Sequence, residues 1–130
     1  AWLSGEGASA KERLNGGVVA YRRPDGVKVA DTFNDMLDGN LDAPINRNTS
    51  GMLPPGIDPG VESEQCDEQP VWTGTTPSGD TAEDHCQSWT AEDEKNTYGQ
   101  VGSYGQTNGR WTEECSQPCG ELARFYCVQQ

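Results

Sequence analysis

Residues 66–90, CDEQPVWTGTTPSGDTAEDHCQSWT, carry the densest structural signal in this chain. The apolar run Pro70–Gly74 is typical of a short strand, because valine and tryptophan suit a pleated, half-buried surface. Proline, serine and glycine at positions 77–79 then form a turn signal. A strand that ends in a turn is therefore predicted for the first half of this stretch.

The second half of the stretch favours a helix. Asp80 or Thr81 can cap it, since an acidic residue three positions later completes a capping box. The predicted helix runs to about residue 90, and it places Cys86 and Trp89 on one face. The chain's single histidine, His85, lies on the polar face of this helix, where a solvated side chain is expected.

Toward the amino terminus the predicted elements are short. Residues 1–17 indicate a loop with one helical turn near Ala10–Leu14, and Val18–Arg22 indicates a strand. Asp31 can cap a short helix that follows. Residues 41–60 are rich in proline, glycine and asparagine, and they predict an ordered loop without regular structure.

Beyond residue 90 the sequence predicts a loop and a last strand. Residues 95–110 are glycine-rich and indicate a flexible surface loop, whereas the alternating side chains of Ala123–Val128 suit a strand. Each of Trp72, Trp89 and Trp111 lies next to a cysteine or a predicted strand. We assign these three tryptophans to the core rather than to a ligand platform.

The composition limits the number of domains and the size of the core. The chain has 130 residues, which fits one domain over 1–130, and only 32% of them are hydrophobic, so the core is small. Four tryptophans, four tyrosines and five cysteines nevertheless favour a folded chain, because aromatic burial and disulfides stabilise small domains. We predict an α+β domain with short strands, one or two short helices and long loops.

The charge restricts the possible partners. The formal net charge is -12, which repels nucleic acid, anionic lipid and heparin-like polymers. Calcium or basic protein partners remain compatible with it. No stretch approaches the roughly 20 apolar residues that span a bilayer, so no membrane insertion is expected from this segment.

The cysteine count is odd, with residues at positions 66, 86, 115, 119 and 127. One thiol is therefore free, bonded to another molecule, or separated from a partner outside this sequence. His85, Cys86, Cys115 and Cys119 could in principle bind zinc, but their spacing is not the tight two-residue knuckle of most structural sites. A disulfide framework is the preferred interpretation, and it places the chain in a secreted or cell-surface setting.

Several segments together resemble a known family: Val71–Gly74, Cys86–Thr90, Cys119 and Arg124–Gln130. They look like a bacterial family of uncharacterised extracellular domains found in Leptospira surface lipoproteins and in myxobacteria. That family is similar to endostatin, the carboxy-terminal domain of certain collagens, whose fold is related to C-type lectins. The resemblance implies an endostatin-like (C-type-lectin-like) α+β domain.

The resemblance also implies a disulfide pattern. It pairs Cys86 with Cys119, and it leaves Cys66 and Cys115, which lie outside the endostatin pattern, as the remaining pair. In the family, the cysteine at the position of Cys127 bonds one on an upstream helix. We therefore expect an amino-terminally truncated domain, whose first helix precedes Ala1 and whose Cys127 has lost its partner.

Function is expected to be binding rather than catalysis. Nothing in the sequence singles out a nucleophile with a base, or one acid with one base. The resemblance implies an extracellular module for a protein or matrix partner. The zinc and heparin sites of endostatin-like domains are not expected, because the chain has one histidine and a negative charge.

Two alternatives remain. One is a calcium-dependent carbohydrate-binding module, in which Asn108, Glu113 and Glu114 would supply oxygen ligands for calcium and a glycan would be the partner. The other is an accessory domain of a larger secreted enzyme.

Overall fold

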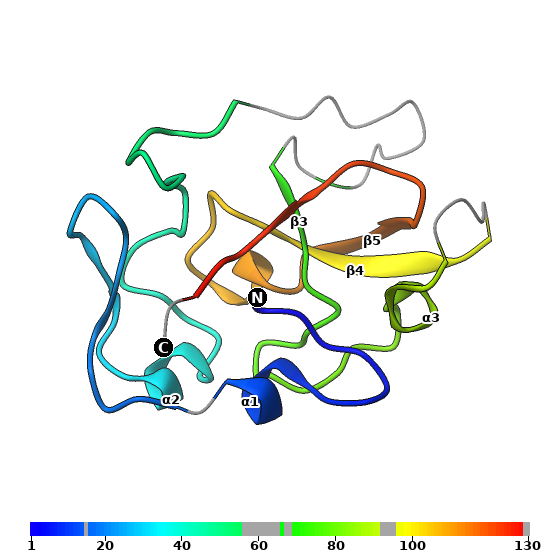
Figure 1. Ribbon diagram of the computed structural model, residues 1–130, viewed down its shortest axis with the longest axis horizontal. Coiled ribbons are helices and arrows are strands. Elements are labelled where there is room, and N and C mark those ends of the chain that lie inside the picture. The colour runs from blue at the N-terminus through cyan, green and yellow to red at the C-terminus, as the bar shows by residue number, and fades with distance from the viewer. Residues whose placement is uncertain (15, 56–65, 67–68, 92–95, 129–130) are drawn as a thin grey trace.

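The computed structural model describes the chain except for residues 15, 56–65, 67, 68, 92–95, 129 and 130 (Figure 1). Its elements follow in the order α1 (Ala10–Arg13), β1 (Tyr21–Arg22), β2 (Lys28–Ala30), α2 (Phe33–Met36), β3 (Pro70–Trp72), α3 (Cys86–Trp89), β4 (Tyr98–Ser103), the 3-10 turn η1 (Gly109–Trp111), β5 (Cys115–Pro118) and β6 (Arg124–Phe125). The α+β class predicted from the sequence is confirmed, with few short helices and two sheets.

The larger sheet crosses the middle of the molecule in the order β5-β4-β3-β6 (Figure 1). β4 is antiparallel to both β3 and β5, whereas β6 is parallel to β3, with Val71 opposite Arg124 and Trp72 opposite Phe125. β1 and β2 form a separate antiparallel hairpin at one side of the molecule. β6 and β1 are therefore edge strands in the described part of the chain.

The prediction of a loop over residues 95–110 is wrong, because part of this segment forms β4, an inner strand of the larger sheet. The glycines serve close packing rather than flexibility. A Cβ atom on Gly99 would lie 2.7 Å from the ring of Trp72, and one on Gly102 would overlap the backbone of Trp111. Glycine in a strand often marks such a close approach, and the sequence does not distinguish it from glycine in a loop.

The long helix predicted from residue 80 is also wrong. Only the four residues of α3 form a helical turn, and all four have positive φ values between 48° and 66°. The turn is therefore left-handed, a conformation that L-residues rarely adopt in succession. Its cap is His85, whose Nδ1 accepts a hydrogen bond from the backbone N–H of Ser88 at 2.9 Å. His85 is half-buried, in contrast to the solvated residue expected.

The short elements near the amino terminus are close to expectation. The predicted helical turn is α1. The predicted strand forms only over β1, and Val18 and Val19, which precede it, are exposed. The cap of α2 differs, because Thr32 rather than Asp31 accepts the hydrogen bond from the N–H of Asp35. The loop predicted over 41–60 has no helix or strand through residue 55, and its remainder lies outside the described residues.

The main core surrounds Trp2, a residue that the sequence analysis left in a loop. Trp2 and Trp111 are both fully buried, with ring centroids 4.9 Å apart, and Tyr126 packs on Trp111 at 5.7 Å. A smaller cluster joins Trp72 to Trp89 at 5.6 Å. The assignment of Trp72 and Trp111 to the core is confirmed, and Trp89 is half-buried against the smaller cluster.

A buried network of hydroxyl groups joins the amino terminus to β3 and η1. Ser4, Thr73, Thr75 and Thr112 are all fully buried. Ser4 Oγ and Thr75 Oγ1 are 2.8 Å apart, Thr75 Oγ1 donates to the Thr73 carbonyl, and Thr73 Oγ1 donates to the Thr112 carbonyl. Thr112 Oγ1 donates to the Thr75 carbonyl and accepts from Trp2 Nε1 at 2.8 Å. The network satisfies polar groups that water cannot reach.

The substitution Thr112→Val tests this network. Valine keeps the shape of threonine but leaves Trp2 Nε1 and the Thr75 carbonyl without their partner, so the free energy of unfolding should fall by about 1–3 kcal/mol. Urea denaturation measures the change. The control Thr49→Val makes the same chemical change at an exposed residue and should leave stability nearly unaltered. Equal effects of the two variants would contradict the role given to the network.

Candidate functional site

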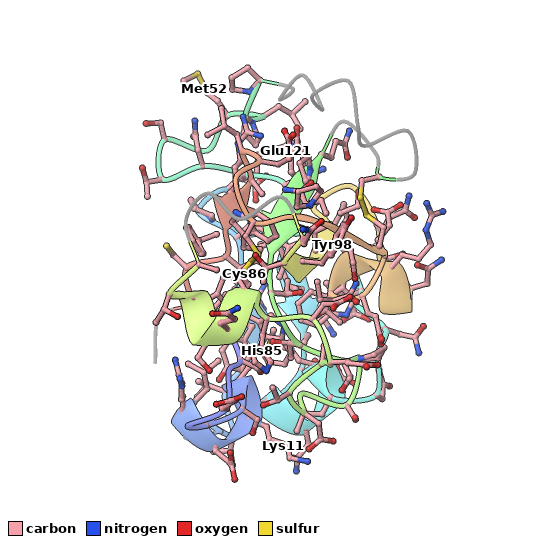
Figure 2. The ribbon with its side chains drawn as sticks, turned by 90° about the vertical axis from the view of Figure 1, so that its right-hand side faces the viewer. Lys11, Met52, His85, Cys86, Tyr98 and Glu121 are labelled. Atoms are coloured by element: carbon pink, nitrogen blue, oxygen red, sulfur yellow. A yellow bond between two sulfur atoms is a disulfide. The ribbon has the colours of Figure 1, made fainter. Side chains whose placement is uncertain are left out.

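The described cysteines form two disulfides, Cys66–Cys115 and Cys86–Cys119, and Cys127 is free and exposed. These are the pairs that the family resemblance implies. A cysteine in a disulfide has no thiolate with which to bind a metal ion. The zinc ligand set considered for His85 therefore does not form, although Figure 2 shows His85 beside Cys86 at α3.

The candidate calcium ligands are engaged in other interactions. Asn108 caps η1 by accepting a hydrogen bond from the N–H of Arg110 at 3.1 Å. Glu114 is bound to the Arg110 guanidinium, and its side chain is only 4% exposed. Glu113 is exposed to solvent. The structure thus brings the three residues into one loop without directing their oxygens toward a common ion.

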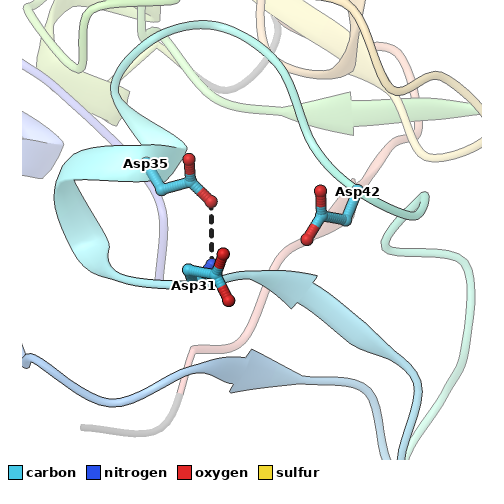
Figure 3. A group of neighbouring side chains, drawn as sticks. All are labelled: Asp31, Asp35 and Asp42. Atoms are coloured by element: carbon cyan, nitrogen blue, oxygen red, sulfur yellow. Dashed lines mark hydrogen bonds between the residues drawn. The ribbon is translucent and has the colours of Figure 1, made fainter.

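One group of three carboxylates converges within the described residues: Asp31, Asp35 and Asp42 (Figure 3). A cation of the protein already lies against it, because Lys28 Nζ is 2.7 Å from Asp31 Oδ1 and 2.8 Å from Asp42 Oδ2. The hydrogen bonds that the Lys28 ammonium donates to Asp31 and then to Asp42 raise the pKa of Lys28. Asp35 in turn accepts the backbone N–H of Asp31. Lys28 therefore offsets only part of the negative charge of the three carboxylates.

A cleft of about 770 Å³ opens on the described surface. Its lining includes the segment 19–24, which contains β1, and the segment 124–128, which contains β6. Residues 45 and 47–49 and Pro54 also line it. Buried apolar side chains form part of the lining: Val29, Met36 and Val71. The volume falls in the range of roughly 300–1,000 Å³ that is typical of ligand sites.

Arginine dominates the charge of this cleft. Four of the chain's six arginines line it, Arg22, Arg23, Arg47 and Arg124, and among the described residues no aspartate or glutamate belongs to its lining. This local charge is opposite to the net charge of -12 of the whole chain. The cleft is therefore a basic, partly apolar site on an acidic protein.

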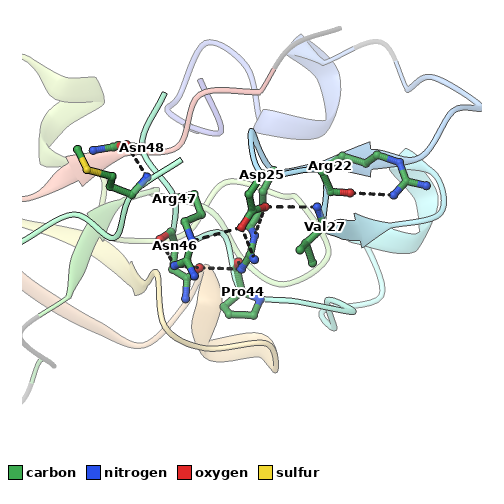
Figure 4. Close-up of polar contacts among 10 residues, drawn as sticks. Arg22, Asp25, Val27, Pro44, Asn46, Arg47 and Asn48 are labelled. Carbon is green, nitrogen blue, oxygen red and sulfur yellow. Dashed lines mark hydrogen bonds and ion pairs between the residues drawn. The ribbon is translucent and has the colours of Figure 1, made fainter. Parts of the chain in front are cut away.

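Two of these arginines share one carboxylate just outside the lining (Figure 4). Arg23 Nη2 is 2.7 Å and Arg47 Nε 3.3 Å from Oδ2 of Asp25. Arg23 also donates to Asn46 Oδ1 at 2.8 Å and to the Pro44 carbonyl at 3.2 Å. Arg23 and Arg47 thus fix the β1–β2 turn against the segment 44–47 and have little capacity left for a ligand.

The other two arginines have no carboxylate partner among the described residues. Arg22 is exposed and donates to the Gly26 carbonyl at 3.0 Å. The guanidinium of Arg124 lies 5.5 Å from the centre of the Tyr104 ring and donates through Nη2 to the Pro55 carbonyl. Arg124 Nη1 is shielded from solvent and has no hydrogen-bond partner in the described structure. Neither of these two arginines therefore has an ion-pair partner within the described residues.

An exposed apolar rim extends the cleft onto the surface. Val19 and Phe125 are 70% and 53% exposed, and both belong to the lining. The adjacent Val18 is 91% exposed. Exposed apolar groups around a charged centre are typical of an interaction site.

The sequence analysis missed this cleft. Its signal was the presence of arginine at 22, 23, 47 and 124 in a strongly acidic chain. Arg47 is joined to Arg23 by the ion pairs at Asp25, and Arg124 is brought to the cleft by the placement of β6 beside β3. Charge counting finds the residues, but the parallel pairing that joins them is not readable from a single sequence.

Asp25→Asn tests the arrangement of the cleft wall. The hydrogen bond from Arg23 holds the pKa of Asp25 below its ordinary value of 3.8. A carboxyl with a lowered pKa stabilises the fold above its unfolded-state pKa, and this contribution disappears as pH falls through the folded-state pKa. Asp25→Asn should therefore have a lower Tm than the unmodified chain at pH 7, and the two Tm values should converge near pH 2. A constant difference across this range would contradict the ion pairing.

No family model matches the chain, and no curated protein or solved structure is significantly similar to it. Among the described residues, no helix is both long and apolar enough to cross a membrane. The two disulfides are consistent with an extracellular or secreted setting, because such bonds persist in oxidising compartments.

Proposed function

We propose that this chain is a non-catalytic, extracellular or cell-surface binding module that holds a protein or matrix partner in the arginine-lined cleft. The fold proposed with it is the endostatin-like, C-type-lectin-like one that the sequence resembles. The observation that carries the proposal is the convergence of four arginines and an exposed apolar rim on one cleft of an acidic chain.

The chemistry of the lining supports binding. Guanidinium groups on apolar walls suit a ligand that combines a negative charge with apolar surface, and arginine and aromatic residues are enriched in protein interfaces. The chain's one histidine, His85, lies at α3 and does not line the cleft. The free Cys127 belongs to the lining, but a binding role does not require its thiol.

The calcium-dependent lectin has no specific observation in its favour. Asn108 and Glu114 are committed to η1 and to Arg110, and the Asp31 cluster already holds Lys28. An accessory role within a larger secreted enzyme would use the same cleft for attachment to a partner. The lectin alternative is tested by the glycans of the binding array.

The experiment is a binding array of matrix proteins and glycans, probed with the unmodified chain and with Val19→Glu. A glutamate at position 19 would pair with the cleft arginines and disrupt the apolar rim, so binding to a protein on the array should weaken roughly tenfold or more. The matched control is Leu122→Glu, which changes a residue that is 76% exposed and outside the cleft.

Each outcome is informative. Protein binding that Val19→Glu weakens, that Leu122→Glu leaves intact and that a chelator does not change supports the proposal. Glycan binding that a chelator abolishes would replace it with the lectin function. An array on which the unmodified chain binds nothing, or equal loss from the two variants, would overturn the use of this cleft.

A further inference from the structure

We propose that the occupant of the cleft is an extended peptide segment in which an aspartate or glutamate lies between apolar residues, with its carboxylate on Arg124 and Arg22. This inference rests on the proposed function and specifies the chemistry of the partner. Three features support it: the two arginines without a carboxylate partner, the charge of the chain, and the two strand edges that border the cleft.

The free hydrogen-bonding capacity of the cleft is concentrated in two residues. Arg23 and Arg47 are bound to Asp25, whereas Arg22 and Arg124 have no carboxylate partner in the described structure. The Nη1 atom of Arg124 lacks any hydrogen bond there although solvent does not reach it. A carboxylate cannot reach an atom that its neighbours cover, so it would accept from the other N–H groups of the Arg124 guanidinium. A carboxylate is the acceptor that the planar guanidinium fork fits best.

Arg124 is also held in place before a ligand arrives. Its guanidinium lies over the ring of Tyr104, which is buried, and Nη2 is bound to the Pro55 carbonyl. A side chain that is already ordered loses less conformational freedom on binding. The cost of fixing an anion at this point is therefore reduced.

The overall charge selects among anions. A net charge of -12 repels every anion at long range, and it repels a polyanion most, because the repulsion grows with the charge of the ligand. A single carboxylate suffers least and still forms an ion pair with an arginine of the cleft. Apolar neighbours on the ligand add to its affinity by covering the exposed rim at Val19 and Phe125.

The walls of the cleft favour an extended chain over a compact ligand. Residues of β6 and of β1 both line the cleft, and each strand has a neighbour on only one side in the described part of the structure. An edge strand offers backbone groups to an added strand, with pockets giving specificity for alternate side chains. The exposed rim continues past the cleft to Val18, which a peptide can cover and a small ligand cannot.

The test uses a phage-displayed library of random heptapeptides, selected on the unmodified chain. The most enriched sequence is then synthesised with a fluorescent label, together with a version in which its acidic residue is replaced by the corresponding amide. Dissociation constants are measured by fluorescence anisotropy for the unmodified chain and for Arg124→Gln, Arg22→Gln and Arg13→Gln. Arg13 lies on α1, outside the cleft, so Arg13→Gln makes the same change in net charge and serves as the control.

The expected result is enrichment of peptides with an acidic residue between apolar ones. Arg124→Gln and the amide peptide should each weaken binding roughly tenfold or more, Arg22→Gln should weaken it severalfold, and Arg13→Gln should leave it unchanged. Arg22 is exposed, so its variant remains informative if Arg124→Gln fails to fold, which circular dichroism would reveal.

Failure of this inference is distinguishable from failure of the proposed function. Two results would overturn the acidic peptide but retain the cleft as a binding site. The first is that the enriched peptides lack acidic residues. The second is that they bind Arg124→Gln and Arg22→Gln normally while Val19→Glu abolishes binding. Library selection that yields no binding peptide would also overturn it. The protein array, with Val19→Glu and its control, decides independently whether the cleft binds a partner at all.

Discussion

The buried hydroxyl network is the constraint on which the rest of the structure depends. Each hydroxyl group of the network has one proton to donate, and the contacts show where it goes. Thr75 Oγ1 donates to the Thr73 carbonyl, so Ser4 Oγ must donate to Thr75 Oγ1. Thr112 Oγ1 donates to the Thr75 carbonyl and accepts from Trp2 Nε1. No member can rotate without leaving a buried group unpaired. The network thereby fixes the amino-terminal segment, with Trp2 at its head, against β3 and η1.

The anchored amino-terminal segment in turn holds Trp89, and with it one end of α3. Trp89 Nε1 donates to the Ser4 carbonyl at 2.7 Å, and the Cys86–Cys119 disulfide holds the other end of α3. A left-handed turn costs about 1–2 kcal/mol for each L-residue. Such a turn persists where the surrounding contacts outweigh its cost, and here a covalent bond and a tryptophan fixed to the amino-terminal segment provide them. A chain with so few aliphatic residues uses these specific contacts where larger domains use bulk burial.

What could be predicted from the sequence was the local chemistry of short segments. Pro70–Gly74 is the site of β3, and the helical turn near Ala10 is α1, because strand and cap preferences act within a few residues. Long-range contacts decided the rest. Gly99 belongs to an inner strand because Trp72 packs where its side chain would be, and residues 80–85 are not helical although a capping box was available. The cleft depends on β6 lying parallel to β3, and a strand of two residues has almost no periodic signal.

The contrast between the acidic chain and its basic cleft has a physical consequence for recognition. Screening at physiological ionic strength limits exposed charges to a range of roughly 8 Å, so the acidic surface governs only the approach of a ligand. Within the cleft, apolar side chains beside the guanidinium groups lower the local dielectric constant and strengthen each guanidinium contact. An anion with little apolar surface is repelled on approach and gains few contacts afterwards, whereas an apolar chain without charge forms no ion pair with Arg22 or Arg124. Long-range repulsion combined with short-range attraction therefore favours ligands in which charge and apolar surface are both present and correctly spaced.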